Sequence, residues 1–274
     1  MTHPAIPAEQ AALLAGIVAR PDDDTARLVY ADWLQEHGDE EQAQYIRDAI
    51  ALDCLSTYED VKRERLGQRL DKIADARGEN WLRALGVIDS LPHFDRGMLF
   101  DVNFDSANAF LACAPALMTR TPVQYLGIGS DGFSDDDLDW LSRLAELPNL
   151  HNLRGLTLSN GAQPFSTEAW EWLVSAPQLS ELESLTVTGA ALTDADALVL
   201  AERASMKRLR ELDLSENYLT AAGALAVVRS RHFAGLERVS LHGNAVEVDR
   251  TRGSDYLALR DELFKRFDNA GGIA

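Results

Sequence analysis

Apolar residues recur with helical spacing over residues 1–96. Between residues 24 and 38 the apolar face consists of Leu28, Ala31, Trp33 and Leu34. Asp24 is placed to cap the start of this helix, and Gly38 is placed to end it. Similar patterns predict further helices over residues 8–19, 39–55 and 58–78, the last ending at Gly78. The region up to residue 96 is therefore predicted to be an all-helical domain.

From about residue 97 the apolar pattern changes and begins to repeat. The segments LRGLTLSNG, LESLTVTGAAL, LRELDLSENYL and LERVSLHGNAV share the template L-x-x-L-x-L, and they start at residues 153, 182, 209 and 236. Successive starts lie 29, 27 and 27 residues apart, which is the period of leucine-rich repeats. Residues 123–133 fit the template as well, and residues 99–110 fit it loosely. The chain is therefore predicted to be an α/β protein: a leucine-rich-repeat solenoid, with parallel strands concave and helices convex, preceded by the helical domain.

Template positions one, four and six point into the predicted solenoid. Each buried side chain there contributes about 1.5–3 kcal/mol, and several repeats must stack to bury them. At the ninth position, Asn217 and Asn244 are expected to bond backbone groups that the turn leaves unpaired. Earlier repeats have Asp131, Gly161 and Ala190 at this position, so the first half of the solenoid is expected to be less regular.

Capping residues precede the helices that are predicted between the strands: Ser134, Ser166 or Thr167, Thr193 and Thr220. Ser134 and Thr193 are each followed three residues later by an aspartate, as in a capping box. We interpret the aspartates at 135–137 as a first helical turn, with a metal site as the alternative. The last predicted helix caps the open end of the solenoid, with partner binding as the alternative, and its apolar face consists of Tyr256, Leu259, Leu263, Phe264 and Phe267.

Template positions three, five and seven point outward onto the concave face. They hold mostly small or hydroxylated residues in the first repeats and charged residues in the last two. We predict that the chain is a non-enzymatic protein–protein interaction module, which contacts another protein through this face. The predicted partner-binding residues are Tyr125, Glu211, Asp213, Ser215, Arg238, Ser240 and His242.

A hydrolase is the alternative function. Ser215 and His242 fall on neighbouring strands, about 4.8 Å apart, with Asp213 diagonal to the histidine. A nucleophile, a base and an orienting acid are thus present, but an open sheet offers no oxyanion hole. The histidines have none of the spacings of zinc ligands, so no metal and no cofactor are expected.

Three glycines, Gly127, Gly129 and Gly132, have the G-x-G-x-x-G spacing of a dinucleotide-binding loop. Such a loop opens directly into a helix, and an acidic residue follows about 20 residues later. Here Phe133 and Ser134 intervene before the predicted helix. We therefore interpret the three glycines as a strip without side chains on the concave sheet, where a partner backbone approaches closely.

Charge and composition narrow the range of partners. The formal net charge of −18 is spread over both halves of the chain and disfavours nucleic-acid binding, while it favours a basic or mixed-charge protein partner. No apolar run is long enough to span a membrane, and the first residues lack the features of a signal peptide. Two isolated cysteines, Cys54 and Cys113, fit a reducing compartment. We expect a cytoplasmic protein.

The segment RPDDDTARLVYADWLQEHGDEEQAQYIR at residues 20–47 resembles the bacterial repeat-companion domain, whose core reads DDDTxRLVYADWLxEHGD. Residues 96–128 look like that family's entry into its repeats, and LTDADALVLA and LTAAGALAVV are similar to helices of ribonuclease-inhibitor-like repeats. The resemblance implies an interaction module without catalytic residues. We predict three domains: a helical repeat-companion-like domain over 1–96, the solenoid over 97–250 and a C-terminal capping helix over 251–274.

The densest polar and aromatic group lies within the first of these domains. We interpret it as a helix cap plus a buried helix face, with a docking patch as the alternative. Its members are Asp22, Asp23, Asp24, Tyr30, Asp32 and Trp33.

For the chain as a whole, we predict the role of a regulatory or target protein in a bacterial signalling or defence system.

Overall fold

The computed structural model describes residues 6–56, 58–87, 90–129, 139–159, 161, 164–247 and 254–267. The chain divides into two compact units. Unit 1 comprises Met1–Phe104, Ala109–Gln124 and Leu147–Asn152, and unit 2 comprises Asp105–Asn108, Tyr125–Glu146 and Leu153–Ala274. None of the helices in the described part of the chain has the length and apolar character that crossing a lipid bilayer requires.

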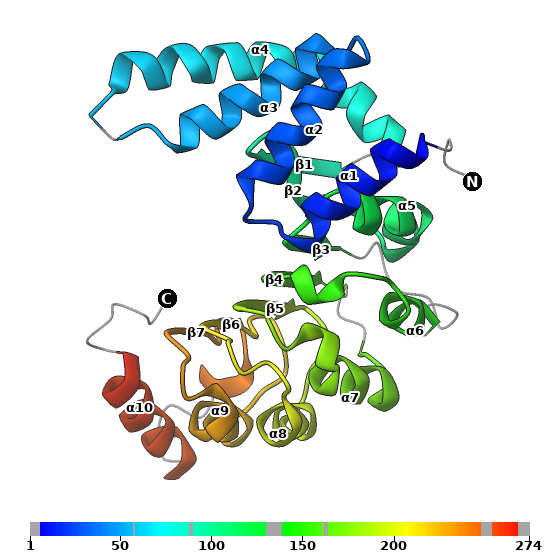
Figure 1. The fold of residues 1–274 in the computed structure, drawn as a ribbon. Helices are drawn as coiled ribbons and strands as arrows, with labels where there is room; N and C mark the ends of the chain where they lie inside the picture. The colour runs from blue at the N-terminus through cyan, green and yellow to red at the C-terminus, as the bar shows by residue number, and fades with distance from the viewer. Residues whose placement is uncertain are drawn as a thin grey trace. The chain divides into compact units, whose positions relative to one another are not determined.

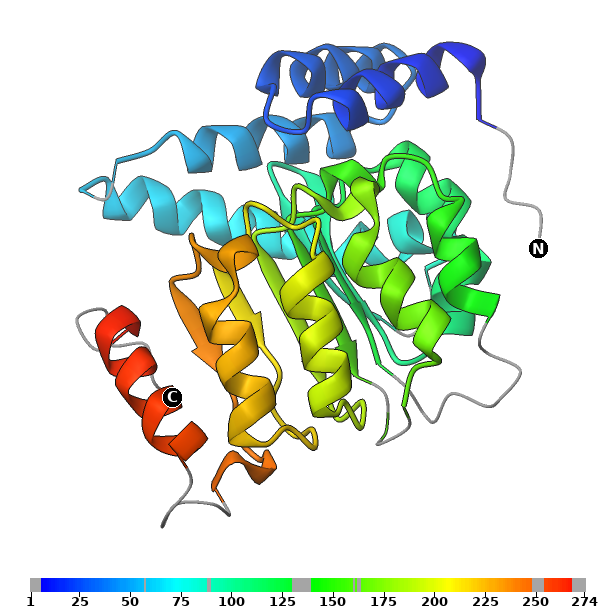
Figure 2. The same cartoon turned by 90° about the horizontal axis from the view of Figure 1, so that it is seen from below.

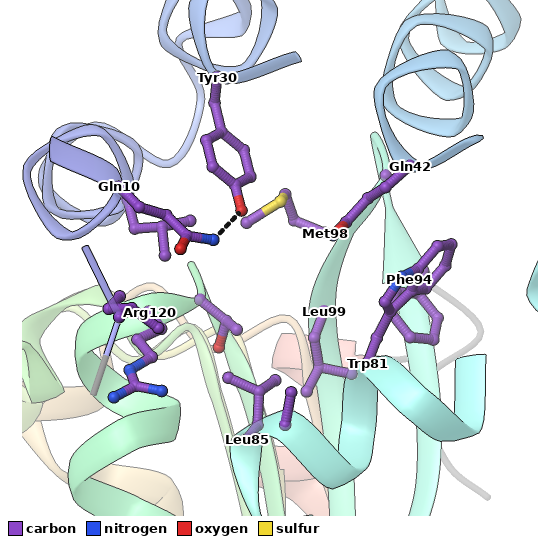
Figure 3. Close-up of a pocket in the computed structure, with 14 residues that line it drawn as sticks. Gln10, Tyr30, Gln42, Trp81, Leu85, Phe94, Met98, Leu99 and Arg120 are labelled. Carbon is purple, nitrogen blue, oxygen red and sulfur yellow. Dashed lines mark hydrogen bonds between the residues drawn. The ribbon is translucent and has the colours of Figure 1, made fainter. Parts of the chain in front are cut away.

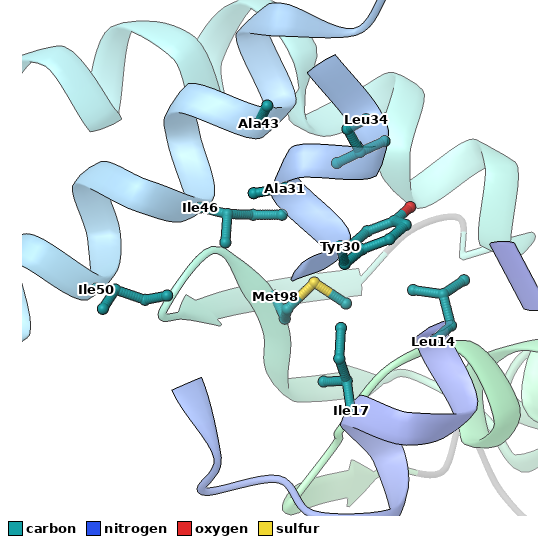
Figure 4. Close-up of a cluster of buried hydrophobic side chains, with 9 residues drawn as sticks. All are labelled: Leu14, Ile17, Tyr30, Ala31, Leu34, Ala43, Ile46, Ile50 and Met98. Carbon is teal, nitrogen blue, oxygen red and sulfur yellow. The ribbon is translucent and has the colours of Figure 1, made fainter. Parts of the chain in front are cut away.

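Unit 1 begins with four helices, α1 (Ala8–Ala19), α2 (Asp24–Glu36), α3 (Glu40–Asp53) and α4 (Asp60–Leu85) (Figure 1). Ala31 and Leu34 of α2 are buried as predicted, whereas Leu28 is exposed and Trp33 is only half-buried. Side chains from the first three helices and the following strands form the core that Figure 4 shows. Its residues are Leu14, Ile17, Tyr30, Ala31, Leu34, Ala43, Ile46, Ile50 and Met98.

The prediction that the fourth helix ends at Gly78 is wrong. Helix α4 continues for another seven residues to Leu85, and Gly86 ends it in the left-handed conformation at φ 76°. A glycine inside a helix costs only about 1 kcal/mol. The next turn packs an aromatic cluster in which the Trp81 ring lies 4.9 Å from Tyr45 and 6.0 Å from Phe94. The stabilisation from this packing outweighs the weak tendency of Gly78 to end the helix.

We predicted that residues 1–96 form an all-helical domain, and this prediction is wrong. Strands β1 (Ser90–Asp95) and β2 (Met98–Phe104) form an antiparallel hairpin, which helix α5 (Ala107–Arg120) follows. The two turn residues, Arg96 and Gly97, have φ angles of 44° and 76°. A two-residue turn with both φ angles positive matches the twist of a hairpin, and Gly97 supplies one of them at low cost.

Unit 2 contains five parallel strands, β3 (Tyr125–Ile128), β4 (Gly155–Ser159), β5 (Ser184–Thr188), β6 (Glu211–Asp213) and β7 (Arg238–Ser240). Their register places one apolar residue from every strand in a single row, and each member is buried. This row consists of Leu126, Leu156, Leu185, Leu212 and Val239. The prediction of an α/β fold whose repeating leucines share one buried layer under parallel strands is confirmed.

The strands of unit 2 are connected by the helices α6 (Asp139–Ala145), α7 (Thr167–Ser175), α8 (Asp194–Arg203) and α9 (Ala221–Arg229) and by the short 3-10 segments η3 (Pro177–Leu179) and η4 (Arg231–Phe233). A further 3-10 segment, η5 (Ala245–Glu247), follows β7, and η2 (Leu150–Asn152) lies in unit 1. Helices α7, α8 and α9 pack side by side in one layer along the strands (Figure 2). Ser166 and Thr220 cap their helices as predicted, and Thr193 with Asp196 forms the predicted capping box. The predicted cap at Ser134 lies outside the described residues.

The last helix, α10 (Ser254–Phe267), packs against α9 (Figure 1). Leu259 and Phe267 of its predicted apolar face are buried, but Phe264 is 64% exposed. The guanidinium of Arg266 donates hydrogen bonds to the carbonyl oxygens of Val228 and Phe233, close to the end of α9. The bond to Val228 satisfies a carbonyl oxygen in the last turn of α9, where the helix end leaves acceptors without an intrahelical partner, whereas the Phe233 carbonyl oxygen also accepts from the Leu236 amide.

Candidate functional site

The five parallel strands of unit 2 place two rows of side chains opposite to the buried leucines. Alternate residues of a strand point to opposite faces, so the residues that flank each leucine share the other face. We call these ten residues the interaction face. One row consists of Tyr125, Gly155, Ser184, Glu211 and Arg238, and the other consists of Gly127, Thr157, Thr186, Asp213 and Ser240.

Opposite charges meet at one end of this face. Glu211 and Arg238 are cross-strand partners and form an ion pair, with side chains that are 43% and 60% exposed. An ion pair this open to water stabilises a fold by only about 0.5 kcal/mol. Its main effect is therefore to fix the positions of a negative and a positive charge that remain accessible from outside unit 2.

An aromatic residue marks the other end. Tyr125 is 36% exposed, and its ring covers Gly155 on the next strand. A Cβ atom at Gly155 would lie 2.4 Å from Cδ1 of Tyr125, so only glycine fits beneath the ring. Gly127 is buried, which corrects our expectation that it forms part of a bare, open strip. Between the two ends, Thr157 is exposed and Ser184 and Thr186 are half-buried.

The predicted serine, histidine and aspartate lie close together but engage other groups. The Ser215 hydroxyl is 2.7 Å from the Ser240 hydroxyl, and one donates to the other. The Asp213 carboxylate accepts a hydrogen bond from the Ser215 backbone amide at 2.8 Å. His242 is 72% exposed, with Nε2 3.8 Å from Oε1 of Glu216. Because Ser215 is only 8% exposed, it supports the turn rather than offering a surface contact.

The asparagines at the ninth template position lie where the strands turn. Asn217 is 2% exposed, and Asn244 is 6% exposed. As predicted, the Asn217 side chain bonds backbone groups on its own and on the preceding repeat. Its Oδ1 accepts from the amides of Ala190 and Leu192, and its Nδ2 donates to the carbonyl oxygens of Val187, Leu214 and Ser215.

Asn244 repeats this arrangement one strand later. Its Oδ1 accepts from the amide of Leu219 at 2.9 Å, and its Nδ2 donates to the carbonyl oxygen of Leu214 at 2.8 Å. These bonds satisfy buried backbone groups that would otherwise have no partner. The two asparagines therefore hold the charged end of the interaction face in register.

The acidic group near the start of unit 1 is engaged in contacts within that unit. Asp23, and not Asp24 as predicted, caps α2, and hydrogen bonds from Thr25 lower the pKa of Asp23. Asp24 and Asp22 lie 3.2 and 3.5 Å from the guanidinium of Arg96 at the hairpin turn. These acidic residues thus connect α2 to the hairpin through ion pairs, as expected for a structural cap rather than a docking patch.

The remaining predicted members of this group also have structural contacts. The Tyr30 hydroxyl accepts a hydrogen bond from Gln10 at 3.0 Å, and the Trp33 ring stacks on His37 with centroids 4.0 Å apart. Asp32 accepts a hydrogen bond from Arg47 at 2.7 Å.

No protein-family model matches the chain, and no curated protein matches its sequence. The resemblance of residues 20–47 to the repeat-companion domain therefore stays a prediction. Within the residues that the structure describes, no group of three or more His, Cys, Asp and Glu side chains is placed to hold a metal ion. The aspartates at 135–137 lie outside those residues.

The two cysteines are predicted to differ sharply in reactivity. Cys54 is exposed after α3, whereas Cys113 is fully buried in α5, and burial raises the pKa of its thiol to about 11. The thiolate is the reactive form, so the native chain should react with a thiol reagent once at pH 8 and twice after denaturation. A Cys54→Ser variant provides the control, because it should show no rapid reaction until it unfolds. Rapid labelling of native Cys54→Ser would contradict the burial of Cys113.

Proposed function

We propose that this chain is a non-enzymatic protein–protein interaction module that binds its partner through the interaction face. The observation behind this proposal is the strand register, which aligns hydroxyl and charged side chains on one side of a sheet whose other side is buried. A rigid sheet holds such groups in place before binding, which lowers the entropy cost of association.

The proposal includes the architecture that the repeats predict. We propose that unit 2 is a leucine-rich-repeat solenoid of the ribonuclease-inhibitor-like class and that the helices of unit 1 are a repeat-companion-like domain. The recurrence of strand, turn asparagine and helix supports the first part, since each repeat buries its leucines only against its neighbours. The open, parallel arrangement leaves the interaction face available to a partner.

Charge defines the class of partner. The net charge of −18 favours a basic or mixed-charge protein, and the Glu211–Arg238 pair presents both signs to it. Charges of this kind affect orientation and the rate of encounter more than affinity. We propose that the partner is an enzyme of a bacterial signalling or defence system, in the cytoplasm, that this protein regulates or that acts on it.

The competing proposal is a hydrolase that uses Ser215, His242 and Asp213. Two contacts favour the interaction module instead: the Ser215 hydroxyl pairs with Ser240, and the Asp213 carboxylate accepts from a backbone amide. A nucleophilic serine needs its hydroxyl hydrogen-bonded to a base. His242, the proposed base, faces Glu216.

A charge swap tests the interaction face without disturbing the fold. In the double variant Glu211→Arg/Arg238→Glu, the ion pair and the net charge are kept but the pattern is reversed. We expect partner recovery in affinity purification to fall at least about tenfold, which corresponds to the loss of one well-placed charge contact. The matched control is Glu171→Arg/Arg203→Glu, which reverses an ion pair of 2.8 Å between α7 and α8.

The control variant should recover the partner as wild type does. Equal recovery by the face variant and wild type would exclude the charged end of the interaction face as the contact. Loss of the partner from the control variant alone would place the contact on the helices.

A further inference from the structure

The proposed function leaves two exposed apolar surfaces without a role. One is an open pocket in unit 1, whose walls include Phe94, Met98 and Leu99 (Figure 3). Its apolar walls do not select one apolar occupant over another. The second surface is the outward side of α10, where the order of the side chains does select an occupant.

Helix α10 has one buried side and one exposed side. It follows α9 at the end of the row of helices (Figure 2), and its residues Leu259 and Phe267 are buried. Leu257 and Phe264 are instead 48% and 64% exposed. They are seven residues apart, which is about two helical turns, so they lie on the same side of α10. The helix therefore presents two large apolar side chains to water.

Two charged residues lie between these apolar side chains. Arg260 and Asp261 follow Leu257 by three and four residues, which is the spacing of neighbours on one helix face. Their side chains are 63% and 61% exposed, and Nη2 of Arg260 lies 3.2 Å from Oδ1 of Asp261. A guanidinium has five N–H donors and a carboxylate has two acceptor oxygens, so this contact engages only part of each group. We call Leu257, Arg260, Asp261 and Phe264 the α10 stripe.

The α10 stripe is complementary to a second copy of itself. In an antiparallel pair of these helices, centred between Arg260 and Asp261, residues at equal distances from the centre face each other. Leu257 of each copy then meets Phe264 of the other, and Arg260 of each copy meets Asp261 of the other. A parallel pair would instead place like charges together. Two apolar contacts thus flank two opposite-charge contacts, as in a self-complementary, two-fold symmetric interface.

The charge of α10 also favours contact between two copies. The helix has three acidic and three basic side chains, Asp255, Asp261 and Glu262 against Arg260, Lys265 and Arg266, so its net charge is zero. The whole chain has a net charge of −18. Two copies therefore repel each other least where α10 meets α10. At physiological ionic strength, charges more than about 8 Å away from the contact are largely screened.

We propose that two copies of this chain form a weak, two-fold symmetric dimer through the α10 stripe. Leu257 and Phe264 supply the apolar contacts, and Arg260 and Asp261 set the antiparallel register. Four side chains from each copy make an interface smaller than the roughly 1,200 Å² at which stable complexes begin. The expected dissociation constant of the dimer is therefore on the order of 100 μM.

Sedimentation equilibrium of the full chain tests this dimer. In physiological salt, the mass of wild type should rise from that of a monomer toward that of a dimer between about 5 and about 500 μM. Leu257→Asp should raise the dissociation constant at least about tenfold, because symmetry places a charge in both apolar contacts. The matched control is Leu198→Asp, since Leu198 on α8 is also 48% exposed. This control should dimerise as wild type does.

Charge variants test the antiparallel register. Asp261→Arg brings two positive charges together at both charged contacts, and Arg260→Asp brings two negative charges together. Each variant alone should therefore dimerise at least about tenfold more weakly than wild type. An equimolar mixture of the two should dimerise to within about threefold of wild type, because a pair of unlike variants has opposite charges at both contacts. Circular dichroism establishes that each variant is folded.

The proposal is overturned if wild type stays monomeric up to about 500 μM, or if folded Leu257→Asp dimerises as wild type does. It is also overturned if the mixture of charge variants is no more dimeric than its components, or if Leu198→Asp weakens the dimer as much as Leu257→Asp does. If Leu257→Asp does not fold, the charge variants decide the question. No variant alters the interaction face, so failure of the dimer and failure of the proposed function are distinguishable.

Discussion

Replacing Asn217 with alanine should lower the free energy of unfolding by about 4 kcal/mol, since several buried backbone groups lose their partners at once. The side chain is 2% exposed and makes five hydrogen bonds, all to backbone atoms of two successive repeats. Urea unfolding followed by circular dichroism measures the loss. Hydrogen exchange should locate it at the turns after β5 and β6.

Asn108 provides the matched control for this variant. It is exposed at the start of α5, so Asn108→Ala should change the unfolding free energy by less than about 0.5 kcal/mol. If Asn217→Ala proved as mild as Asn108→Ala, the two asparagines would not be what holds the turns, and the account of the charged end of the interaction face would fail.

Replacing Gly97 with alanine should destabilise unit 1 by about 3 kcal/mol, through backbone strain and overpacking together. Gly97 has φ 76°, a conformation that alanine adopts at a cost. The added Cβ atom would also lie 2.5 Å from the Cα atom of Ile46 on α3, and a backbone atom cannot move aside cheaply. Urea unfolding by tryptophan fluorescence, which includes Trp33 and Trp81 of unit 1, measures the effect.

Gly38 separates these two contributions. It has φ 86°, but nothing lies within 4 Å of a Cβ atom placed there. Gly38→Ala should therefore cost only the backbone part, about 1 kcal/mol. Equal losses in the two variants would mean that the hairpin turn does not press against α3, and that strain at φ alone explains Gly97.

The sequence pattern predicted most elements of unit 2 but missed features of unit 1. The leucine spacing correctly predicted strands β4 to β7. Few structures other than stacked parallel strands bury every second residue of segments that recur at a constant interval. The hairpin of β1 and β2 was missed because Arg96 and Gly97 are a weaker turn signal than Asn-Gly, and Pro92 argues against a strand.

For the interaction face, the sequence predicted which residues lie on the face but not which contacts their side chains make. Template counting correctly put Glu211 opposite to Arg238 and Asp213 opposite to Ser240. It did not predict that Ser215 is buried or that His242 faces Glu216, because a one-dimensional repeat does not specify side-chain rotamers at a turn. For Thr157, Ser184 and Thr186, the sequence predicted only that this part of the face is small and polar.

The repeat alone was sufficient to assign the parallel strands, their register and the buried leucine row, since all three follow from periodic local patterns. Packing between segments far apart in the chain settled the rest. Helix α4 passes Gly78 because Trp81 meets Tyr45 and Phe94, and Gly97 is required because α3 lies against it.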